Sequence, residues 1–338
     1  MADAEILCEA RRVVRPLAGR PESRWYMEQR NLGRCGVALP VIGFGCGPNA
    51  QLMVGSDAEL QQKTVAHALE IGVNFFDTAA LYGDGLSEVN LGRALHELGA
   101  TPIVCTKVLL DASDYADVRG GVLRSVESSL DRLQLASIAS VMLHNRVGST
   151  RDVRTEGAGV TIGLDDVFGP RGLVAAFDEL RRSGITTAAG FTSFGGEPKA
   201  IRELIDSGSF DALNASYNVV NPSALRPVGP HIGEDDYEQV MGAAAARGMG
   251  VMAIRVLSSG ALLSPVADGK EARLGAIAEE VGESVVSLAI RYVLSTSDVT
   301  TAIMGISEPQ HLDDAVDAAS RGPLDPATIA RVEAIALE

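Results

Sequence analysis

Short apolar segments alternate with helix-like segments eight times between about residue 40 and the end of this 338-residue chain. Such alternation predicts a parallel β-sheet, because a helix returns the chain to the start of each new strand. Eight repeats in one chain favour a closed (β/α)8 barrel, the TIM barrel, over an open sheet. The expected strands are residues 41–44, 73–76, 103–106, 138–143, 186–190, 212–216, 251–254 and 300–304.

The segments between these strands have helical spacing of apolar residues, with one exception. Residues 145–170 are polar and are expected to form a long loop. Residues 27–32 and 37–39 flank Gly33-Arg34-Cys35-Gly36, which predicts an N-terminal β-hairpin that plugs the bottom of the barrel. We therefore expect a polar extension over residues 1–26 and a single barrel domain over residues 27–338. Helices are expected at 57–71, 87–98, 121–133, 173–182, 199–207, 237–247, 272–281, 285–294 and 309–319, with an extra C-terminal helix at 326–337.

Composition excludes several classes of protein. Lys and Arg number 29 against 44 Asp and Glu, a net charge of −15, which repels the phosphate backbone of nucleic acids. No apolar run reaches the ~18 residues of a membrane span, and the N-terminus lacks a signal-peptide core. Cys8, Cys35, Cys46 and Cys105 show no spacing typical of a zinc site or a disulfide framework. These features predict a cytoplasmic protein with a small-molecule substrate, no bound metal and no membrane or nucleic-acid partner.

Polar side chains follow several predicted strands, where barrel enzymes carry their chemistry. Asp77 ends the second strand, Tyr82 lies in the loop after it, Lys107 ends the third strand and His144 follows the fourth. Each has a structural interpretation when taken alone, such as a helix cap or a solvated strand end. Four such residues at three successive strand ends favour a common catalytic site.

These four residue types suit proton transfer to a carbonyl. A phenol has a pKa near 10, and a nearby ammonium is expected to lower the pKa of Tyr82. A carboxylate keeps that ammonium charged, and an imidazole can orient a carbonyl oxygen. The set predicts a general acid for carbonyl reduction, or a base for alcohol oxidation. The hydride must come from a cofactor, because no side chain donates one.

The same region resembles the signature of the aldo-keto reductases. The resemblance extends over most of the chain, and Asn31-Leu32-Gly33-Arg34 is similar to the usual opening of the family. It implies an NAD(P)-dependent aldo-keto reductase with Asp77, Tyr82, Lys107 and His144 as its catalytic tetrad. The main matching run is Asn74-Phe75-Phe76-Asp77-Thr78-Ala79-Ala80-Leu81-Tyr82-Gly83, continued by Gly85-Leu86-Ser87-Glu88 and Leu91-Gly92.

The resemblance also implies a set of cofactor-binding residues. Thr192, Ser193 and Asn214 would hydrogen-bond the nicotinamide amide, although the family usually has Ser-Asn and a glutamine at these positions. Cys46 and Gly47 would lie near the nicotinamide. Ile254, Arg255 and Leu257 would line the path of the cofactor. The adenosine end would be surrounded by Gly305, Ile306, Ser307, His311 and Asp314.

Two other interpretations remain open. A Rossmann dehydrogenase needs G-x-G-x-x-G after a strand, but Gly43-Phe44-Gly45-Cys46-Gly47-Pro48 has proline at the third glycine position. The second interpretation is a non-catalytic subunit that binds nicotinamide and regulates a partner. Turnover of an aldehyde or sugar by the purified protein would distinguish an enzyme from such a subunit. No P-loop, H-E-x-x-H or G-x-S-x-G motif supports a phosphotransferase or a hydrolase.

The sequence leaves the cofactor and the substrate less defined. The family more often uses NADP, whose 2′-phosphate is bound by Lys or Arg. Residues 304–311 contain neither, and Glu308 would repel a phosphate, so we expect a slight preference for NAD over NADP. Aldehydes, ketones, aldoses and alcohols all remain candidate substrates.

Overall fold

The computed structural model describes residues 27–153, 160–228, 236–263 and 269–337. Eight parallel strands form a closed barrel in the order β10-β11-β12-β3-β4-β5-β6-β9. The barrel confirms the fold class predicted from the alternating segments. Its strands are β3 (Ile42–Gly45), β4 (Phe75–Asp77), β5 (Ile103–Val108), β6 (Ile138–Leu143), β9 (Thr186–Thr192), β10 (Ala212–Ser216), β11 (Gly250–Ile254) and β12 (Thr301–Gly305).

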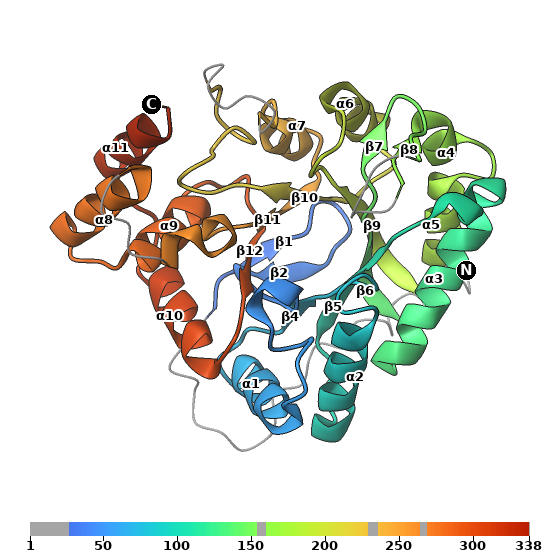
Figure 1. Cartoon of the computed structure of the whole chain (residues 1–338), viewed down its shortest axis with the longest axis horizontal. Coiled ribbons are helices and arrows are strands. Elements are labelled where there is room, and N and C mark those ends of the chain that lie inside the picture. The colour runs from blue at the N-terminus through green and yellow to red at the C-terminus, as the bar shows by residue number, and fades with distance from the viewer. Residues whose placement is uncertain (1–26, 154–159, 229–235, 264–268, 338) are drawn as a thin grey trace, which may run out of the picture.

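Helices surround the strands on the outside of the barrel (Figure 1). Their apolar sides cover strands that are buried on both faces, as in other parallel sheets. Between β11 and β12 the described residues form two α-helices, and the last helix of the chain packs on the first of these, with Lys270 Nζ donating to the Ala336 carbonyl at 2.8 Å. The helices are α1 (Ala58–Glu70), α2 (Leu86–Leu98), α3 (Val118–Leu133), α5 (Leu173–Arg182), α6 (Pro198–Ser207), α7 (Val240–Ala246), α8 (Lys270–Glu280), α9 (Val285–Leu294), α10 (Pro309–Ser320) and α11 (Pro326–Ala336).

The predicted N-terminal hairpin is present and closes one end of the barrel. Strands β1 (Gln29–Asn31) and β2 (Ala38–Pro40) pair antiparallel. Leu32 and Leu39 are fully buried in a cluster with inward-facing residues of seven barrel strands. The turn approaches so closely that a Cβ on Gly33 would lie 2.6 Å from the backbone nitrogen of Gly250, where β11 begins. The hairpin therefore seals the N-terminal end and leaves the other end for chemistry.

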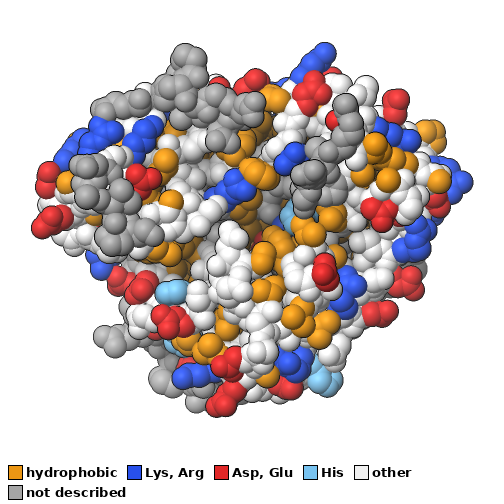
Figure 2. Space-filling view, in the orientation of Figure 1, with side chains coloured by type: hydrophobic (Ala, Val, Ile, Leu, Met, Phe, Trp, Pro, Cys, Tyr) orange, Lys and Arg blue, Asp and Glu red, His pale blue; other side chains and the backbone are white. Residues whose placement is uncertain are grey.

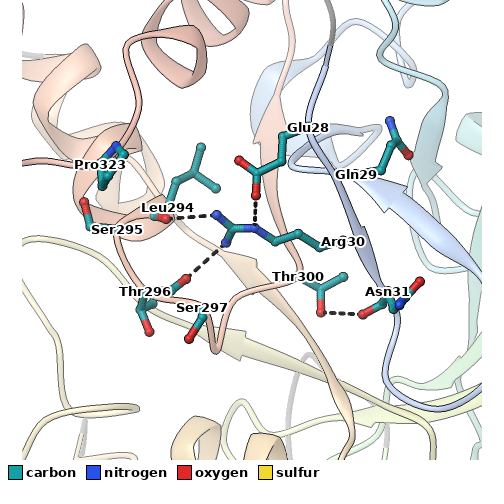
Figure 3. Close-up of a pocket in the computed structure, with 10 residues that line it drawn as sticks. All are labelled: Glu28, Gln29, Arg30, Asn31, Leu294, Ser295, Thr296, Ser297, Thr300 and Pro323. Atoms are coloured by element: carbon teal, nitrogen blue, oxygen red, sulfur yellow. Dashed lines mark hydrogen bonds and ion pairs between the residues drawn. The ribbon is translucent and has the colours of Figure 1, made fainter.

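Arg30 anchors the hairpin to the neighbouring helix α9 (Figure 3). Its guanidinium pairs with Glu28 at 2.8 Å and donates to the carbonyls of Leu294, Thr296 and Val299 at 3.3, 3.1 and 2.7 Å. The Leu294 carbonyl lies in the last turn of α9, where carbonyls lack partners within the helix, so the cation satisfies a group that would otherwise be unpaired. The pocket in Figure 3 therefore lies where the hairpin packs against the end of α9, at the closed end of the barrel.

The segment expected to be one long loop contains regular structure. β7 (Val147–Gly148) pairs with β8 (Ile162–Gly163), and α4 (Leu164–Phe168) follows directly. Arg151 forms an ion pair with the buried Asp166 inside this excursion. Two-residue strands have no periodic pattern, so the sequence could not reveal them. The expected extension over residues 1–26 lies outside the described residues. Among the described residues, no helix is long and apolar enough to cross a membrane.

Candidate active site

Three of the four predicted catalytic side chains meet at the ammonium of Lys107. Its Nζ lies 2.6 Å from Asp77 Oδ2, 2.9 Å from the Thr78 carbonyl oxygen and 3.1 Å from the Tyr82 hydroxyl. β4 supplies Asp77, whose register partner on the adjacent strand β5 is Cys105, and Lys107 lies two residues further along β5. The side chains of Lys107 and Asp77 are 3% and 4% exposed, which makes this a buried charge pair.

Lys107 stays charged at neutral pH. Burial acts to lower the pKa of Lys107, but the Asp77 carboxylate, with Tyr82 and Cys105, raises that pKa above its ordinary value. A buried ammonium needs such a partner, because an isolated charge in a medium of low polarity would lose its proton. The cluster thus holds a positive charge beside the phenol.

Lys107 acts to lower the pKa of Tyr82, as expected, but the net shift of that pKa is upward. Burial raises the pKa of Tyr82, and the ammonium of Lys107 offsets this only in part. The reason is desolvation, which disfavours the phenolate and depends on packing that the sequence does not show. Tyr82 therefore rests as a neutral phenol, the form that can donate a proton.

His144 completes the cluster from the end of β6. Its ring meets the Tyr82 ring edge-on, with centroids 5.7 Å apart. Burial, with repulsion from Lys107, lowers the pKa of His144 to about 3. The imidazole is neutral at physiological pH and can donate or accept one hydrogen bond at each nitrogen. Its buried Nδ1 has no partner among the described residues.

The residues expected to hold the nicotinamide amide lie together at the ends of β9 and β10. Thr192 is in register with Asn214, and the Ser193 hydroxyl donates to the Asn214 carbonyl at 3.2 Å. Asn214 is 1% exposed, yet its side-chain oxygen has no hydrogen-bond partner in the described part of the chain. A buried unpaired carbonyl oxygen suits an amide donor, so these residues fit a carboxamide.

Cys46 and Gly47, expected to lie near the nicotinamide, contact Asp77 and Tyr82. The Cys46 backbone nitrogen donates to the Asp77 carbonyl at 2.9 Å. A Cβ on Gly47 would be 3.8 Å from the Tyr82 ring, an ordinary van der Waals distance, so Gly47 lies directly beside the phenol. Burial raises the pKa of the Cys46 thiol far above its ordinary value, which excludes a thiolate nucleophile at this position.

Ile254 ends β11, and Arg255 and Leu257 lie in the segment that follows it. The Arg255 guanidinium stacks over the Phe194 ring at 3.7 Å from its centroid, and its backbone is left-handed at φ +57°. Its carbonyl accepts a hydrogen bond from Asn218 at 3.1 Å. Ile254 and Leu257 are partly buried on either side. The stacked guanidinium is exposed, so its charge remains available to a phosphate.

The residues expected around the adenosine lie at a separate strand end, where β12 leads into α10. Gly305 is exposed and Ile306 is buried. The Ser307 backbone nitrogen donates to His311 Nδ1 at 3.4 Å, while His311 Nε2 lies 3.5 Å from Glu308. Asp314 accepts from Gln310 at 2.9 Å. No Lys or Arg occupies residues 305–314.

Sequence reasoning gave no role to Thr78 or Ser87. The Ser87 hydroxyl donates to the Cys46 carbonyl at 3.0 Å and lies 2.9 Å from the Thr78 hydroxyl. The Thr78 carbonyl in turn accepts from Lys107. All of these groups are buried. Through Thr78, Ser87 therefore connects the segment that contains Cys46 with the residue that binds the Lys107 ammonium. Both residues belong to the run that resembles the family signature, which could have indicated a role in the site. A serine or threonine beside a strand or at the start of a helix, however, often has only a structural hydrogen bond.

A parallel eight-stranded barrel with these groups at the C-terminal strand ends defines the class of α/β-barrel enzymes. The chain belongs to the aldo/keto reductase family, because the model of that family matches residues 41–337. It is accordingly an oxidoreductase by family.

Known proteins with similar sequences span nearly the whole chain. L-galactose dehydrogenase from Arabidopsis thaliana is 27% identical, with 91% of this chain and 94% of that protein aligned. A putative voltage-gated potassium channel subunit beta from Schizosaccharomyces pombe is 23% identical, covering 86% of this chain and 87% of that protein. The holo form of aldo-keto reductase AKR11C1 from Bacillus halodurans matches the fold with a TM-score of 0.71 at 23% identity, over 92% of this chain and 96% of that one.

Proposed function

We propose that this protein interconverts a carbonyl and an alcohol with a nicotinamide cofactor, and that Tyr82 is its general acid and base. The observation that carries the proposal is the placement of Lys107 Nζ within hydrogen-bonding distance of both Asp77 and the Tyr82 hydroxyl. Aldehydes, ketones and aldoses are the substrate class that this arrangement serves.

The nicotinamide, when bound, supplies or accepts the hydride. Thr192, Ser193 and Asn214 would hold its carboxamide. In the reductive direction the neutral phenol of Tyr82 donates a proton to the carbonyl oxygen, and the Lys107 ammonium stabilises the phenolate that remains. The neutral imidazole of His144 orients that oxygen. In the oxidative direction the same groups remove the alcohol proton.

Replacement of Tyr82 by Phe tests this role. Tyr82→Phe removes one hydroxyl and should lower kcat at least ~100-fold, because it deletes the acid/base group. Its dissociation constant for the cofactor should stay within about twofold, since the hydroxyl acts in the transition state. Tyr292→Phe, on helix α9 outside the barrel, is the matched control and should keep full activity. Retention of more than about a tenth of the activity by Tyr82→Phe would contradict the assignment.

The substrate panel follows from the relatives. L-galactose and other aldoses come first, because a relative that aligns over nearly its whole length is named for that dehydrogenation. The similarity to a potassium channel β subunit supports the second candidate, a nicotinamide-binding regulatory subunit. Turnover of any member of the panel by the purified protein favours the enzyme, and cofactor binding without turnover favours the subunit.

We also propose a slight preference for NAD over NADP. The start of α10 repels a 2′-phosphate: Glu308 lies there, Pro309 has no N–H, and the Ser307 N–H is directed at His311. The ratio of kcat/KM for NADH and NADPH at about pH 7.5 should favour NADH. His311→Arg should move that ratio toward NADPH, because it adds the missing cation. A preference of the natural sequence for NADPH above about tenfold, or ~1.4 kcal/mol, would overturn the proposal.

A further inference from the structure

Arg146 stands at the mouth of the proposed active site, and its role is open. It follows His144 by two residues, at the C-terminal end of β6. Two residues of extended chain span about 7 Å, a distance that a small substrate can bridge. Because β6 pairs with β9 in parallel, the segments after these strands leave the barrel side by side. Arg146 therefore lies shortly after His144 in the chain and against the segment that follows the residues proposed to bind nicotinamide.

A glycine makes room for the Arg146 side chain. A Cβ on Gly195 would lie 2.8 Å from Arg146 Nε and 3.2 Å from its Cδ, closer than packed atoms allow. Gly195 also has a left-handed backbone, with φ +69°, which disfavours other residues. Since Gly195 comes two residues after Ser193, the arginine stem rests on the loop that leaves the nicotinamide site.

The guanidinium of Arg146 has no partner within the described residues. Its Nε is buried and unpaired, and no ion pair or side-chain hydrogen bond involves its terminal nitrogens there, which are not buried. The acid on the same loop, Glu197, accepts instead from the backbone nitrogen and hydroxyl of Ser149, at 2.7 and 2.9 Å. Arginines elsewhere, such as Arg151 and Arg132, pair with carboxylates. An arginine left unpaired in so acidic a chain is available for an anion.

A second guanidinium approaches the loop that Arg146 contacts, although the chain carries a net charge of −15. Arg255, from the segment after β11, stacks its guanidinium on Phe194, which lies next to Gly195 in the chain. Figure 2 shows basic side chains beside the hollow near the middle of this face of the molecule. Clefts lined by charge of one sign concentrate ligands of the opposite sign.

We propose that Arg146 is a specificity-determining residue that binds an anionic group, a carboxylate or a phosphate, on the carbonyl substrate. The preferred substrates are then acidic aldehydes, keto acids, or aldoses that carry an acid or a phosphate. A guanidinium recognises both groups through paired charge-assisted hydrogen bonds. This inference rests on the proposed function, since it assigns one end of the substrate whose carbonyl meets Tyr82 and His144.

Matched pairs of substrates test the inference by steady-state kinetics. 4-Oxobutanoate is compared with butanal, and glyceraldehyde 3-phosphate with glyceraldehyde, so that the two arms separate a carboxylate from a phosphate. Arg146→Gln should lower kcat/KM for the anionic member of at least one pair by about 10- to 100-fold, mostly through KM. It should change the neutral member by less than about twofold and leave the KM of the cofactor unchanged.

Two further variants separate binding from misfolding. Gly195→Ala should reproduce the loss, because its Cβ displaces the guanidinium. Arg182→Gln, at an exposed arginine at the end of α5, is the charge-matched control and should change nothing. Equal losses for charged and neutral substrates in Arg146→Gln, or a raised KM for the cofactor alone, would overturn the inference.

A binding measurement keeps the inference testable if no substrate is turned over. In the presence of NAD, millimolar succinate or inorganic phosphate should raise the Tm of the natural sequence, as expected for a ligand that binds the folded state. The increase should be absent in Arg146→Gln. An equal shift in both proteins refutes the role of Arg146. Absence of all turnover, with an Arg146-dependent shift retained, counts against the proposed function alone.

Discussion

At the scale of single residues, the buried pair of Lys107 and Asp77 decides which substitutions are informative. Both side chains are almost fully buried and 2.6 Å apart. Removal of one member leaves the other as an uncompensated buried charge, which destabilises a protein by about 3–5 kcal/mol. Loss of activity in a Lys107 or Asp77 variant would therefore mix catalysis with folding. Tyr82→Phe avoids this problem because it removes no charge.

His144 gives a prediction about pH and stability. Burial and Lys107 lower its pKa to about 3, whereas an unfolded histidine titrates near 6.5. As pH falls below about 6.5, the unfolded chain therefore binds a proton that the folded protein refuses until about pH 3. Stability is lost over this range, at most ~1.4 kcal/mol per pH unit.

Urea unfolding of the natural sequence and His144→Asn at pH 7 and pH 5 measures this effect. The natural sequence should lose roughly 2 kcal/mol more than the variant between the two pH values. Other histidines contribute equally to both proteins and cancel in the comparison. An identical loss in both would mean that His144 is protonated as easily in the folded state as in the unfolded one.

At the scale of elements, α2 is fixed against α3 and β5 by groups from the matched signature. Glu88 is fully buried, pairs with Arg132 of α3 at 2.7 Å and accepts from the Thr106 hydroxyl of β5. Gly92 lets the two helices approach, since a Cβ there would lie 2.6 Å from the carbonyl oxygens of Arg132 and Leu133. These signature residues are structural, and they hold the strand that carries Lys107.

Substitution of two helical glycines tests this packing. Gly92→Ala should lower the free energy of unfolding by about 1–3 kcal/mol, because the added methyl group meets backbone. Gly275→Ala, inside α8 where a Cβ meets nothing within 4 Å, should raise it by about 0.5–1 kcal/mol through helix propensity. Denaturant unfolding measures both changes. Stabilisation by Gly92→Ala would show that α2 can move away from α3 at little cost.

At the scale of the whole molecule, we propose that residues 27–338 form one domain and that residues 1–26 are dispensable. The hairpin that begins after Met27 seals the barrel, and its residues Leu32 and Leu39 belong to the interior cluster. A chain beginning at Met27 should keep its Tm within about 2 °C and its kcat within about twofold. Aggregation or loss of activity would show that the extension packs on the barrel or on another subunit. Differential scanning calorimetry and initial rates make the comparison.

The sequence by itself determined the barrel and which four side chains, Asp77, Tyr82, Lys107 and His144, come together at one end of it. Eight alternations of strand and helix specify the barrel. The spacing of apolar residues shows which side of each segment is buried, and this spacing depends only on residues close together in the chain. Asp77, Lys107 and His144 were predictable because all three lie at or just after strand ends, and parallel strands end on one rim. Expected element boundaries differed from the structure by one to three residues at places such as α3 and α7.

Only the tertiary structure decided how these groups behave. Burial outweighs the effect of Lys107 and raises the pKa of Tyr82. Packing buries the side-chain oxygen of Asn214 without a partner among the described residues. The strands β7 and β8 pair within a segment that the sequence presents as a loop. Packing also leaves Arg146 without a carboxylate. The physical reason is common to all of them: desolvation and pairing depend on distances between segments far apart in the chain. Local patterns in a sequence do not contain those distances.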